Sequence, residues 1–337
     1  MSDCTISATN TSTGSSTPST PATRSPPLVS VPGNPSQTRS ARLSRSPCRR
    51  ATVTSIRKLL ATSTKTIASD HDNSALAYGN EAEVGQGIRE SGVPREQIWV
   101  TTKLDNPWHH RVPEGINSSL KDLGLDYVDL YLIHWPSSTD PNDLKKHLPD
   151  WDFIKTWYAN SPRGKMMILM NNRQEMQKLP ATGKVRNIGV SNFGIKNLEK
   201  LLNDPSCKIV PAVNQIELHP NNPSPKLVAY NAEKGIHCTG YSCLGSTNSP
   251  LYRDPTLLKL AEKKGKTPQQ VLLVWGIQKG WSVIPKSVSK SRIDGNYEID
   301  GWNLTDEEIS QLDNLKDRFK VCDDSWLPVK VFFGDDE

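Results

Sequence analysis

The sequence lacks three features that would place it in familiar classes of protein. No apolar run approaches the roughly 20 residues that a membrane-spanning helix needs, so we expect no membrane partner. No G-x-G-x-x-G follows a strand-like segment, which argues against a Rossmann sheet. No cysteine pair has C-x-x-C spacing and no secretory apolar segment precedes the cysteines, so we interpret them as free thiols in a reducing compartment. The six cysteines are Cys4, Cys48, Cys207, Cys238, Cys243 and Cys322.

Acidic residues are almost absent from the first 69 positions. Nine lysines and arginines stand there against one acid, Asp3, which gives this region a charge of +8. The whole chain carries +5, so residues 70–337 carry −3. The basic character therefore belongs to the N-terminal region, and the remainder offers no electrostatic case for binding nucleic acid.

Residues 1–50 are rich in Ser, Thr, Pro and Arg. We predict a disordered arm, because this composition lacks the apolar surface that would offset the entropy of ordering the chain. An Arg-rich, Ser-rich and acid-poor segment is also typical of an organelle transit peptide. A basic tether, a tail without function and a wrongly assigned coding region are the alternatives. We expect a cytoplasmic protein, or a mitochondrial one if the arm is a transit peptide.

From Ala75 onward, strand-like and helix-like segments alternate, which predicts a parallel α/β fold. Six strand–helix units are clear. The expected strands are 97–104, 125–134, 187–191, 212–217, 238–242 and 282–285. The expected helices are 81–91, 111–123, 152–179, 195–203, 225–234, 256–264, 268–279 and 305–315. The last helix begins with a capping box formed by Thr305 and Glu308.

The segment LDYVDLYLIHWP (125–136) is an apolar, β-prone run that ends in His134, a tryptophan and a proline. Its poor alternation indicates a strand that is buried on both faces, as in a parallel sheet. In a barrel of parallel strands the C-terminal strand ends converge on one face and carry the chemistry. Polar side chains occupy several expected strand ends, and one precedes a helix: Tyr78, Lys103, His134, Ser191, Asn192, Gln215, Tyr241, Lys286 and Ser287.

Seven motifs in order resemble the aldo-keto reductase family. They are AYGNE (77–81), the strand of Lys103, LDYVDLYLIHWP (125–136), GKVRNIGVSNF (183–193), NQIELHP (214–220), GYSCLGS (240–246) and IPKSVSKSRI (284–293). The resemblance covers about 75–337 and is strongest to the fungal branch with NADP-dependent glycerol dehydrogenases and sugar-aldehyde or uronate reductases. It implies a (β/α)₈ TIM barrel over 51–337 that binds NADP(H) across its C-terminal rim, and we expect a monomer without a metal.

The resemblance also implies roles for individual residues. Tyr78 would protonate the carbonyl oxygen of a small polar aldehyde or sugar aldehyde, or act in the reverse oxidation of glycerol or a polyol. A free phenol has a pKa near 10, and an ammonium at about 4 Å would lower it. Lys103 is the residue implied for that task, and His134 would orient the carbonyl. The implied substrate contacts are Trp108, Trp135, Trp326 and Leu327, although Trp326 could equally serve packing alone.

The implied cofactor contacts lie at the later strand ends. Ser191, Asn192 and Gln215 would bind the nicotinamide carboxamide, and Tyr241 would stack beneath the ring. Ser242, Leu244 and Ser246 would follow the pyrophosphate. Lys286, Ser287 and Arg292 would hold the 2′-phosphate, and Asn296 would contact the adenine. The alternative for the basic cluster is a solvated surface.

The sequence departs from the family in three places. The family's His-Ile-Asp-Thr-Ala aligns with HDNSA (71–75), so Asn73 occupies the slot of a catalytic aspartate unless Asp72 reaches it by a one-residue shift. The family's first two strands are not recognisable upstream. The segment 158–173 interrupts an expected helix and is either a surface loop or an unspliced intron read as protein. A catalytically impaired barrel that still binds NADP is therefore the alternative function.

Overall fold

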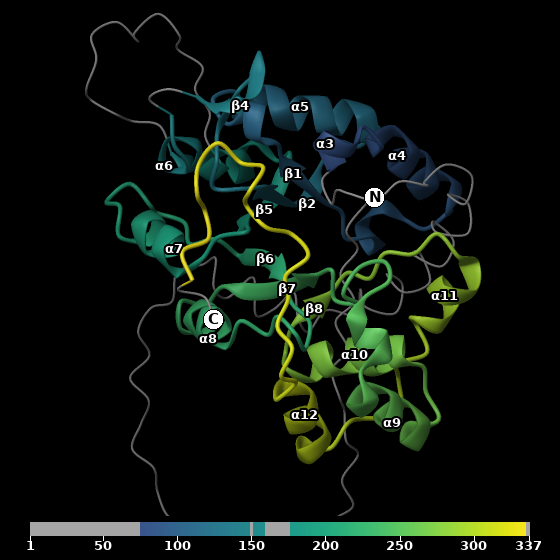
Figure 1. Ribbon diagram of the computed structural model, residues 1–337. Helices are drawn as coiled ribbons and strands as arrows, with labels where there is room; N and C mark the ends of the chain where they lie inside the picture. Colours follow the sequence, from purple (N-terminus) through teal and green to yellow (C-terminus); the bar gives the residue numbers. More distant parts are fainter. Residues whose placement is uncertain (1–74, 149–150, 159–175, 335–337) are drawn as a thin grey trace, which may run out of the picture.

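A single parallel sheet organises the fold, and it is the α/β arrangement that the sequence predicts. The computed structural model describes residues 75–148, 151–158 and 176–334. Within these residues six strands follow the order β1-β2-β5-β6-β7-β8, and every neighbouring pair is parallel (Figure 1). The strands are β1 (Thr101–Leu104), β2 (Val128–Ile133), β5 (Val185–Ser191), β6 (Val213–Glu217), β7 (His237–Tyr241) and β8 (Ser282–Val283).

Helices connect and cover these strands (Figure 1). The α-helices are α3 (Ala75–Tyr78), α4 (Glu81–Glu90), α5 (Val112–Leu123), α6 (Phe153–Trp157), α7 (Ile195–Leu202), α8 (Pro225–Glu233), α9 (Pro255–Lys264), α10 (Pro268–Gln278), α11 (Lys290–Gly295) and α12 (Asp306–Asp313). Short 3₁₀ helices are η1 (Arg95–Gln97), η2 (Asn106–Trp108), η3 (Met176–Thr182) and η4 (Pro250–Arg253). None of the described helices is both long and apolar enough to cross a membrane.

Helix α5 shows how local sequence produces this packing. Val112, Ile116, Leu120 and Leu123 are spaced three or four apart, and all four are buried. The helix ends at Gly124, which has φ of 64°, a left-handed conformation that glycine adopts without the steric penalty of a Cβ atom. The apolar stripe therefore lies against the sheet, and the capping glycine turns the chain toward β2.

The sheet is curved, so that side chains on its inner face meet. Leu130 and Leu132 of β2 form a small buried cluster with Val213 of β6, although β5 separates the two strands in the sheet. Tyr131 and Ile133, which alternate with them, instead join the main core under the helices. The inner face of the sheet is therefore distinct from the face that the helices cover.

Several predicted elements differ from the structure. The first described strand begins at Thr101 rather than residue 97, because Arg95–Gln97 forms a 3₁₀ turn. The helix expected over 152–179 is present as α6 and the 3₁₀ helix η3, which contains Pro180. An antiparallel hairpin, β3 (Thr139–Asp140) and β4 (Asp143–His147), was not predicted, nor was α11. The arm 1–50, Asn73 and residues 159–175 lie outside the described residues.

Other predictions are confirmed. Thr305 and Glu308 form the expected reciprocal capping box of α12, with each side chain accepting a backbone N–H of the other residue. Four cysteines lie in the described part of the chain, and they are free thiols: Cys207, Cys238, Cys243 and Cys322.

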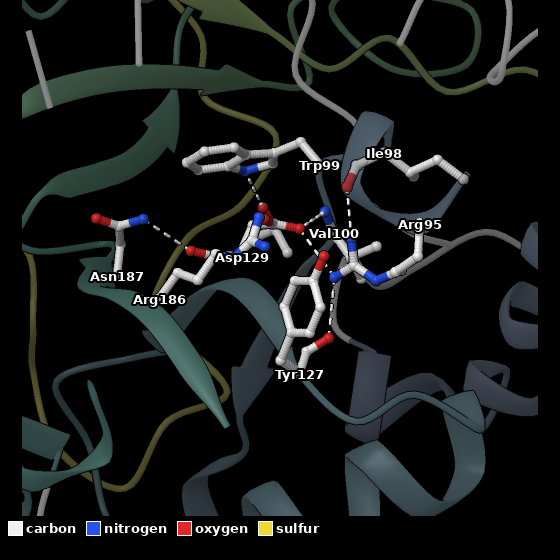
Figure 2. A network of polar contacts seen from close by, with 9 residues as sticks. Arg95, Ile98, Trp99, Val100, Tyr127, Asp129, Arg186 and Asn187 are labelled. Carbon is white, nitrogen blue, oxygen red and sulfur yellow. Dashed lines mark hydrogen bonds and ion pairs between the residues drawn. The ribbon is translucent and has the colours of Figure 1, made fainter. Parts of the chain in front are cut away.

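A buried carboxylate joins the strands at their N-terminal ends (Figure 2). Asp129, near the start of β2, accepts hydrogen bonds from Arg95 at 2.9 Å, Arg186 at 2.8 Å and the backbone N–H of Val100 at 2.9 Å. The two guanidinium groups each lie 4.0 Å from the centre of the Tyr127 ring. This network ties η1, β2 and β5 together at the end opposite to His134, so we assign it to stability.

Candidate active site

Lys103 and His134 lie side by side at the C-terminal ends of β1 and β2. The strands pair in parallel register, with Lys103 opposite Leu132 and Leu104 opposite Ile133. The backbone N–H of His134 continues this pairing by donating to the carbonyl of Leu104 at 3.1 Å. Because Leu132 belongs to the inner cluster, the alternation of a strand puts Lys103 and His134 on that same inner face. Lys103 is only 2% exposed there.

The surroundings of His134 keep its imidazole neutral. Burial is the main cause that lowers its pKa well below the ordinary value, and the charges of Lys103 and His109 lower it further. Its Nδ1 lies 4.0 Å from Oδ1 of Asp105, too far for a hydrogen bond, and has no hydrogen-bond partner among the described residues. A neutral imidazole beside a lysine can donate one hydrogen bond without adding a second positive charge.

A chain of amide and hydroxyl groups continues across the next strand ends. Asn192, directly after β5, donates from Nδ2 to the carbonyl of His134 at 3.1 Å and to Oγ of Ser191 at 3.2 Å. The Tyr241 hydroxyl, at the end of β7, donates to Oδ1 of Asn192 at 2.7 Å. Ser191 in turn donates to the carbonyl of Gln215 at 2.8 Å. These groups fix four strand ends relative to one another.

Gln215 is the one member of this set whose acceptor has no partner within the described residues. Its side chain is 1% exposed, and its Oε1 accepts no hydrogen bond from the part of the chain that the structure describes. A buried amide oxygen without a donor costs about 1–3 kcal/mol. A ligand that presents an N–H group, such as a carboxamide, would remove that cost. The residue therefore fits the carboxamide contact that the sequence predicts.

The loop after β7 has a backbone that few residue types adopt. Ser242, Ser246 and Asn248 have φ values of 45°, 67° and 58°, and Gly245 has φ of 72°. A Cβ atom at Gly245 would lie 2.2 Å from Oγ of Ser249, so no larger residue fits without a shift. Loops of alternating handedness turn backbone N–H groups toward one point and favour anions. Leu244 lies within this loop and is half-buried.

Basic residues follow β8. Lys286 and Arg292 are exposed, and neither forms an ion pair with a carboxylate of the described residues. Lys290, between them, is paired with Asp294 at 2.6 Å. Ser287 accepts a hydrogen bond from the backbone N–H of Ser289 at 3.2 Å. The structure therefore leaves two cations, rather than three, available to a phosphate.

Asn296 begins the turn after α11 and is buried. Its backbone N–H donates to the carbonyl of Arg292 at 2.9 Å, which places the two residues one helical turn apart. The predicted adenine contact and the predicted phosphate contact thus lie on one short helix.

The predicted aromatic residues fall into two groups. Trp135 is buried and lies edge-on to Trp326, with ring centroids 5.3 Å apart. Leu327 joins the same cluster, whereas Trp326 itself is 56% exposed. Trp108 lies in η2, directly after β1, with the Arg111 guanidinium 4.2 Å from its ring centre.

Tyr78 is the last residue of α3, and α3 packs against β1, the strand that carries Lys103. The backbone of α3 therefore lies against the strand that carries Lys103. Asn73 lies outside the described residues.

Known proteins share much of this sequence. The chain matches the aldo/keto reductase family over residues 69–317. The chain belongs to that family. It is 40% identical over 281 residues to glycerol 2-dehydrogenase (NADP(+)) of Saccharomyces cerevisiae, a match that covers 78% of this chain and 84% of that protein. It is 44% identical over 246 residues to D-galacturonate reductase of Hypocrea jecorina, covering 71% and 76% of the two chains.

Solved structures of the family share the fold. An aldo-keto reductase of Bombyx mori in complex with NADP superimposes with a TM-score of 0.63 at 36% identity, covering 79% of this chain and 82% of that one. The aldose reductase of Schistosoma japonicum gives a TM-score of 0.65 at 31% identity, covering 82% and 88%. Aldo-keto reductases are (β/α)₈ barrels, which confirms the predicted fold class, with six of the strands in the described residues.

Membership of this family makes the chain an oxidoreductase of carbonyl compounds. The described residues contain no group of three or more His, Cys, Asp or Glu side chains that could hold a metal ion. The site that the structure does assemble consists of a lysine, a neutral histidine, amides and hydroxyls, and those groups suit proton transfer and carbonyl polarisation.

Sequence reasoning overlooked one buried residue on the face of the sheet opposite to this site. Glu81, the first residue of α4, accepts a hydrogen bond from Oγ1 of Thr102 at 2.8 Å. Burial raises the pKa of its carboxyl group. The bond ties α4 to the strand position directly before Lys103. The sequence did contain Glu81 as the last residue of the AYGNE motif. Its role becomes clear only from its hydrogen bond to Thr102 of β1.

Proposed function

We propose that this chain reduces a small polar aldehyde or sugar aldehyde to the corresponding alcohol, or catalyses the reverse oxidation of glycerol or another polyol. One observation carries the proposal: Lys103 and His134 adjoin on the inner face of the sheet, and the Asn192, Gln215 and Tyr241 groups follow at the next strand ends. A carbonyl placed beside His134 would face both a proton source and a nicotinamide site.

The cofactor is NADP(H), and when bound it supplies or accepts the hydride. The residues of this chain fit it at both ends. Gln215 offers to the carboxamide an amide oxygen that has no donor among the described residues, beside Ser191 and Asn192. The Tyr241 ring would support the nicotinamide, and Ser242, Leu244 and Ser246 lie in the loop that suits a pyrophosphate. Lys286, Ser287, Arg292 and Asn296 would bind the 2′-phosphate and the adenine.

The catalytic roles follow from the chemistry of each side chain. Tyr78 donates the proton to the carbonyl oxygen, and the positive charge of Lys103 stabilises the phenolate that remains. His134, neutral because burial and Lys103 lower its pKa, donates a hydrogen bond that orients the carbonyl without competing as an acid. Trp108, Trp135 and Trp326 would contact the substrate by their apolar rings.

The test measures NADPH oxidation by the full chain, with D-glyceraldehyde, a six-carbon uronate and glycerol with NADP⁺ for the reverse direction. Turnover of at least one aldehyde with NADPH, and much slower turnover with NADH, is the expected result. NADPH binding by fluorescence titration without turnover of any of these compounds would instead identify the catalytically impaired barrel. Absence of both binding and turnover would contradict the proposal entirely.

A further inference from the structure

The C-terminal segment 317–334, here named the strap, returns across the carboxyl edge of the sheet. In Figure 1 the yellow chain leaves α12 and runs past β7 and β6 toward α7. It carries Trp326 and Leu327, which cover Trp135, the residue next to His134. The strap is irregular chain, so it has no ladder of hydrogen bonds of its own to hold it in this place.

Asn221 and the carbonyl of Pro220 hold Asp317, Arg318 and Phe319 by hydrogen bonds, and a buried carboxylate holds the next part of the strap. Glu217, the last residue of β6, accepts the backbone N–H of Val321 on Oε1 at 2.6 Å and that of Cys322 on Oε2 at 2.8 Å. His219 lies 2.9 Å from Oε1 through its Nε2, and the side chains of both Glu217 and His219 are fully buried. Phe319 stacks on the His219 ring with centroids 4.7 Å apart.

A second set of contacts holds the far part of the strap. Asp324 accepts the backbone N–H groups of Val331 and Phe332 at 2.8 and 2.9 Å, and this closes the strap on itself. Asn197 of α7 donates to the carbonyl of Val331 at 3.0 Å. Residues Trp326 and Leu327 therefore lie on the stretch between two fixed points.

We propose that Glu217 is a positioning residue for substrate binding, which acts by seating the strap so that Trp326 and Leu327 lie beside the reacting carbonyl. This inference rests on the proposed function, because it assigns the substrate to the space next to His134. It differs from the predicted roles of Trp326 and Leu327, since Glu217 itself touches neither the substrate nor the cofactor. Glu217 lies two residues after Gln215 on the same strand, so β6 connects the nicotinamide contact with the strap.

The chemistry of the anchor explains why a carboxylate stands here. Two backbone N–H groups and an imidazole N–H converge on Glu217, and a carboxylate has acceptor sites for all three. A glutamine has the same shape but only one acceptor oxygen, and its amide group would oppose at least one of these N–H donors. Hydrogen bonds to a charged acceptor are about twice as strong as neutral ones, so Glu217→Gln releases the strap with little change in volume.

The first test measures hydrogen–deuterium exchange of the full chain by mass spectrometry, on peptides that contain Val321 and Cys322. In Glu217→Gln we expect these amides to exchange about 10- to 100-fold faster, whereas the amides of β6 and β7 keep their protection. The matched control is Glu308→Gln, a buried carboxylate that accepts the backbone N–H of Thr305 at 2.8 Å on α12. Unchanged exchange rates at Val321 and Cys322 in Glu217→Gln would show that Glu217 does not hold the strap.

The second test separates positioning from a merely structural role. Glu217→Gln should raise KM for a six-carbon uronate about fivefold, equivalent to the loss of about 1 kcal/mol of binding. KM for glyceraldehyde, a smaller aldehyde that we expect to contact the strap less, should change less than about twofold, and so should kcat and the Kd of NADPH. An equal rise for both substrates, or no rise for either, would overturn the proposal. The Glu308→Gln control should leave all four quantities at wild-type values.

A variant on the strap itself keeps the proposal testable if Glu217→Gln does not fold. Val321→Pro removes one N–H donor at an exposed residue and leaves the buried carboxylate intact, and it should reproduce the KM pattern. Wild-type KM values in that variant would count against the proposal that Glu217 positions the strap. If the wild-type chain reduces neither substrate, the proposed function fails in that measurement, while exchange at Val321 and Cys322 still reports on the anchor.

Discussion

The hydroxyl of Tyr241 donates a hydrogen bond of 2.7 Å to the amide oxygen of Asn192, and this bond joins the end of β7 to the residue after β5. Asn192 has φ of 63°, a conformation that costs free energy in any residue other than glycine. Its amide also donates to the carbonyl of His134, so the Tyr241 bond helps to fix three strand ends. The same ring is the proposed support of the nicotinamide.

Tyr241→Phe separates these two tasks. The variant keeps the ring but leaves the buried Asn192 oxygen without its donor, so the free energy of unfolding should fall by about 1–2 kcal/mol. The Kd of NADPH should change less than about threefold. Tyr241→Ala removes the ring as well and should weaken NADPH about fivefold or more. Urea unfolding and fluorescence titration measure the two quantities, and equal NADPH affinity in both variants would show that the ring does not support the cofactor.

The basic residues after β8 predict cofactor preference. Arg292→Ala should weaken NADPH at least tenfold and leave NADH nearly unchanged, because a charge-assisted hydrogen bond to phosphate contributes about 1.5–3 kcal/mol. Lys290→Ala is the matched control, since Lys290 is already paired with Asp294 at 2.6 Å. Titration of both cofactors into both variants tests this. Similar losses in the two variants would mean that general positive charge, rather than Arg292, holds the phosphate.

His109 predicts how stability depends on pH. Its pKa is lowered to about 3, mainly by burial and then by the neighbouring charges of His110 and His147. An unfolded histidine has a pKa near 6.5, so below that pH the unfolded chain binds a proton that the folded chain does not. The free energy of unfolding should therefore fall from pH 6.5 toward pH 3, by about 1.4 kcal/mol per pH unit for this residue. His109→Gln should reduce that slope in urea unfolding between pH 7 and 5, and an identical slope would refute the assignment.

The strand ends were predictable because each lies within a few residues of its own sequence signal. Lys103 and His134 follow apolar β-prone runs, and the ends of parallel strands must converge on one edge whatever the details of packing. The order of the six strands follows from the predicted barrel, because each strand of such a barrel pairs with the one before it along the chain. Local sequence pattern was therefore enough to predict that Lys103 and His134 lie together at the carboxyl edge of the sheet.

Contacts between distant segments were not predictable. Glu217 accepts N–H groups from Val321 and Cys322, more than 100 positions later in the chain, and backbone donors leave no mark in the sequence. Asp129 likewise reads as one acid within an apolar strand, and only the fold brings Arg95 and Arg186 to it. The register of the strap and the ion pairs of buried carboxylates depend on tertiary packing, which a single sequence does not specify.

Tyr78→Phe tests the proton donor. The variant should keep NADPH binding but retain less than about one per cent of the reduction rate, because general acid catalysis contributes about 10²–10⁴-fold. Tyr131→Phe is the control: the Tyr131 hydroxyl is buried in β2 without a hydrogen-bond partner among the described residues. Its rate should stay close to wild type. A Tyr78→Phe variant that reduces aldehydes at a wild-type rate would show that the proton comes from another group.

Asn73 supplies the sharpest test, because the family has an aspartate in the aligned position. An amide can accept a hydrogen bond from the ammonium of Lys103 but cannot balance its charge, whereas a carboxylate would do both and hold the lysine in one orientation. Asn73→Asp should therefore raise kcat on glyceraldehyde and leave the Kd of NADPH unchanged. A negative charge near Lys103 also raises the pKa of a phenol beside it, and the phenol must keep its proton to act as the acid. The basic limb of kcat against pH should therefore move to higher pH together with the rise in rate. A kcat that is unchanged or lower, with the same pH profile, would mean either that Asn73 does not occupy the aspartate's position or that the wild-type site is not impaired.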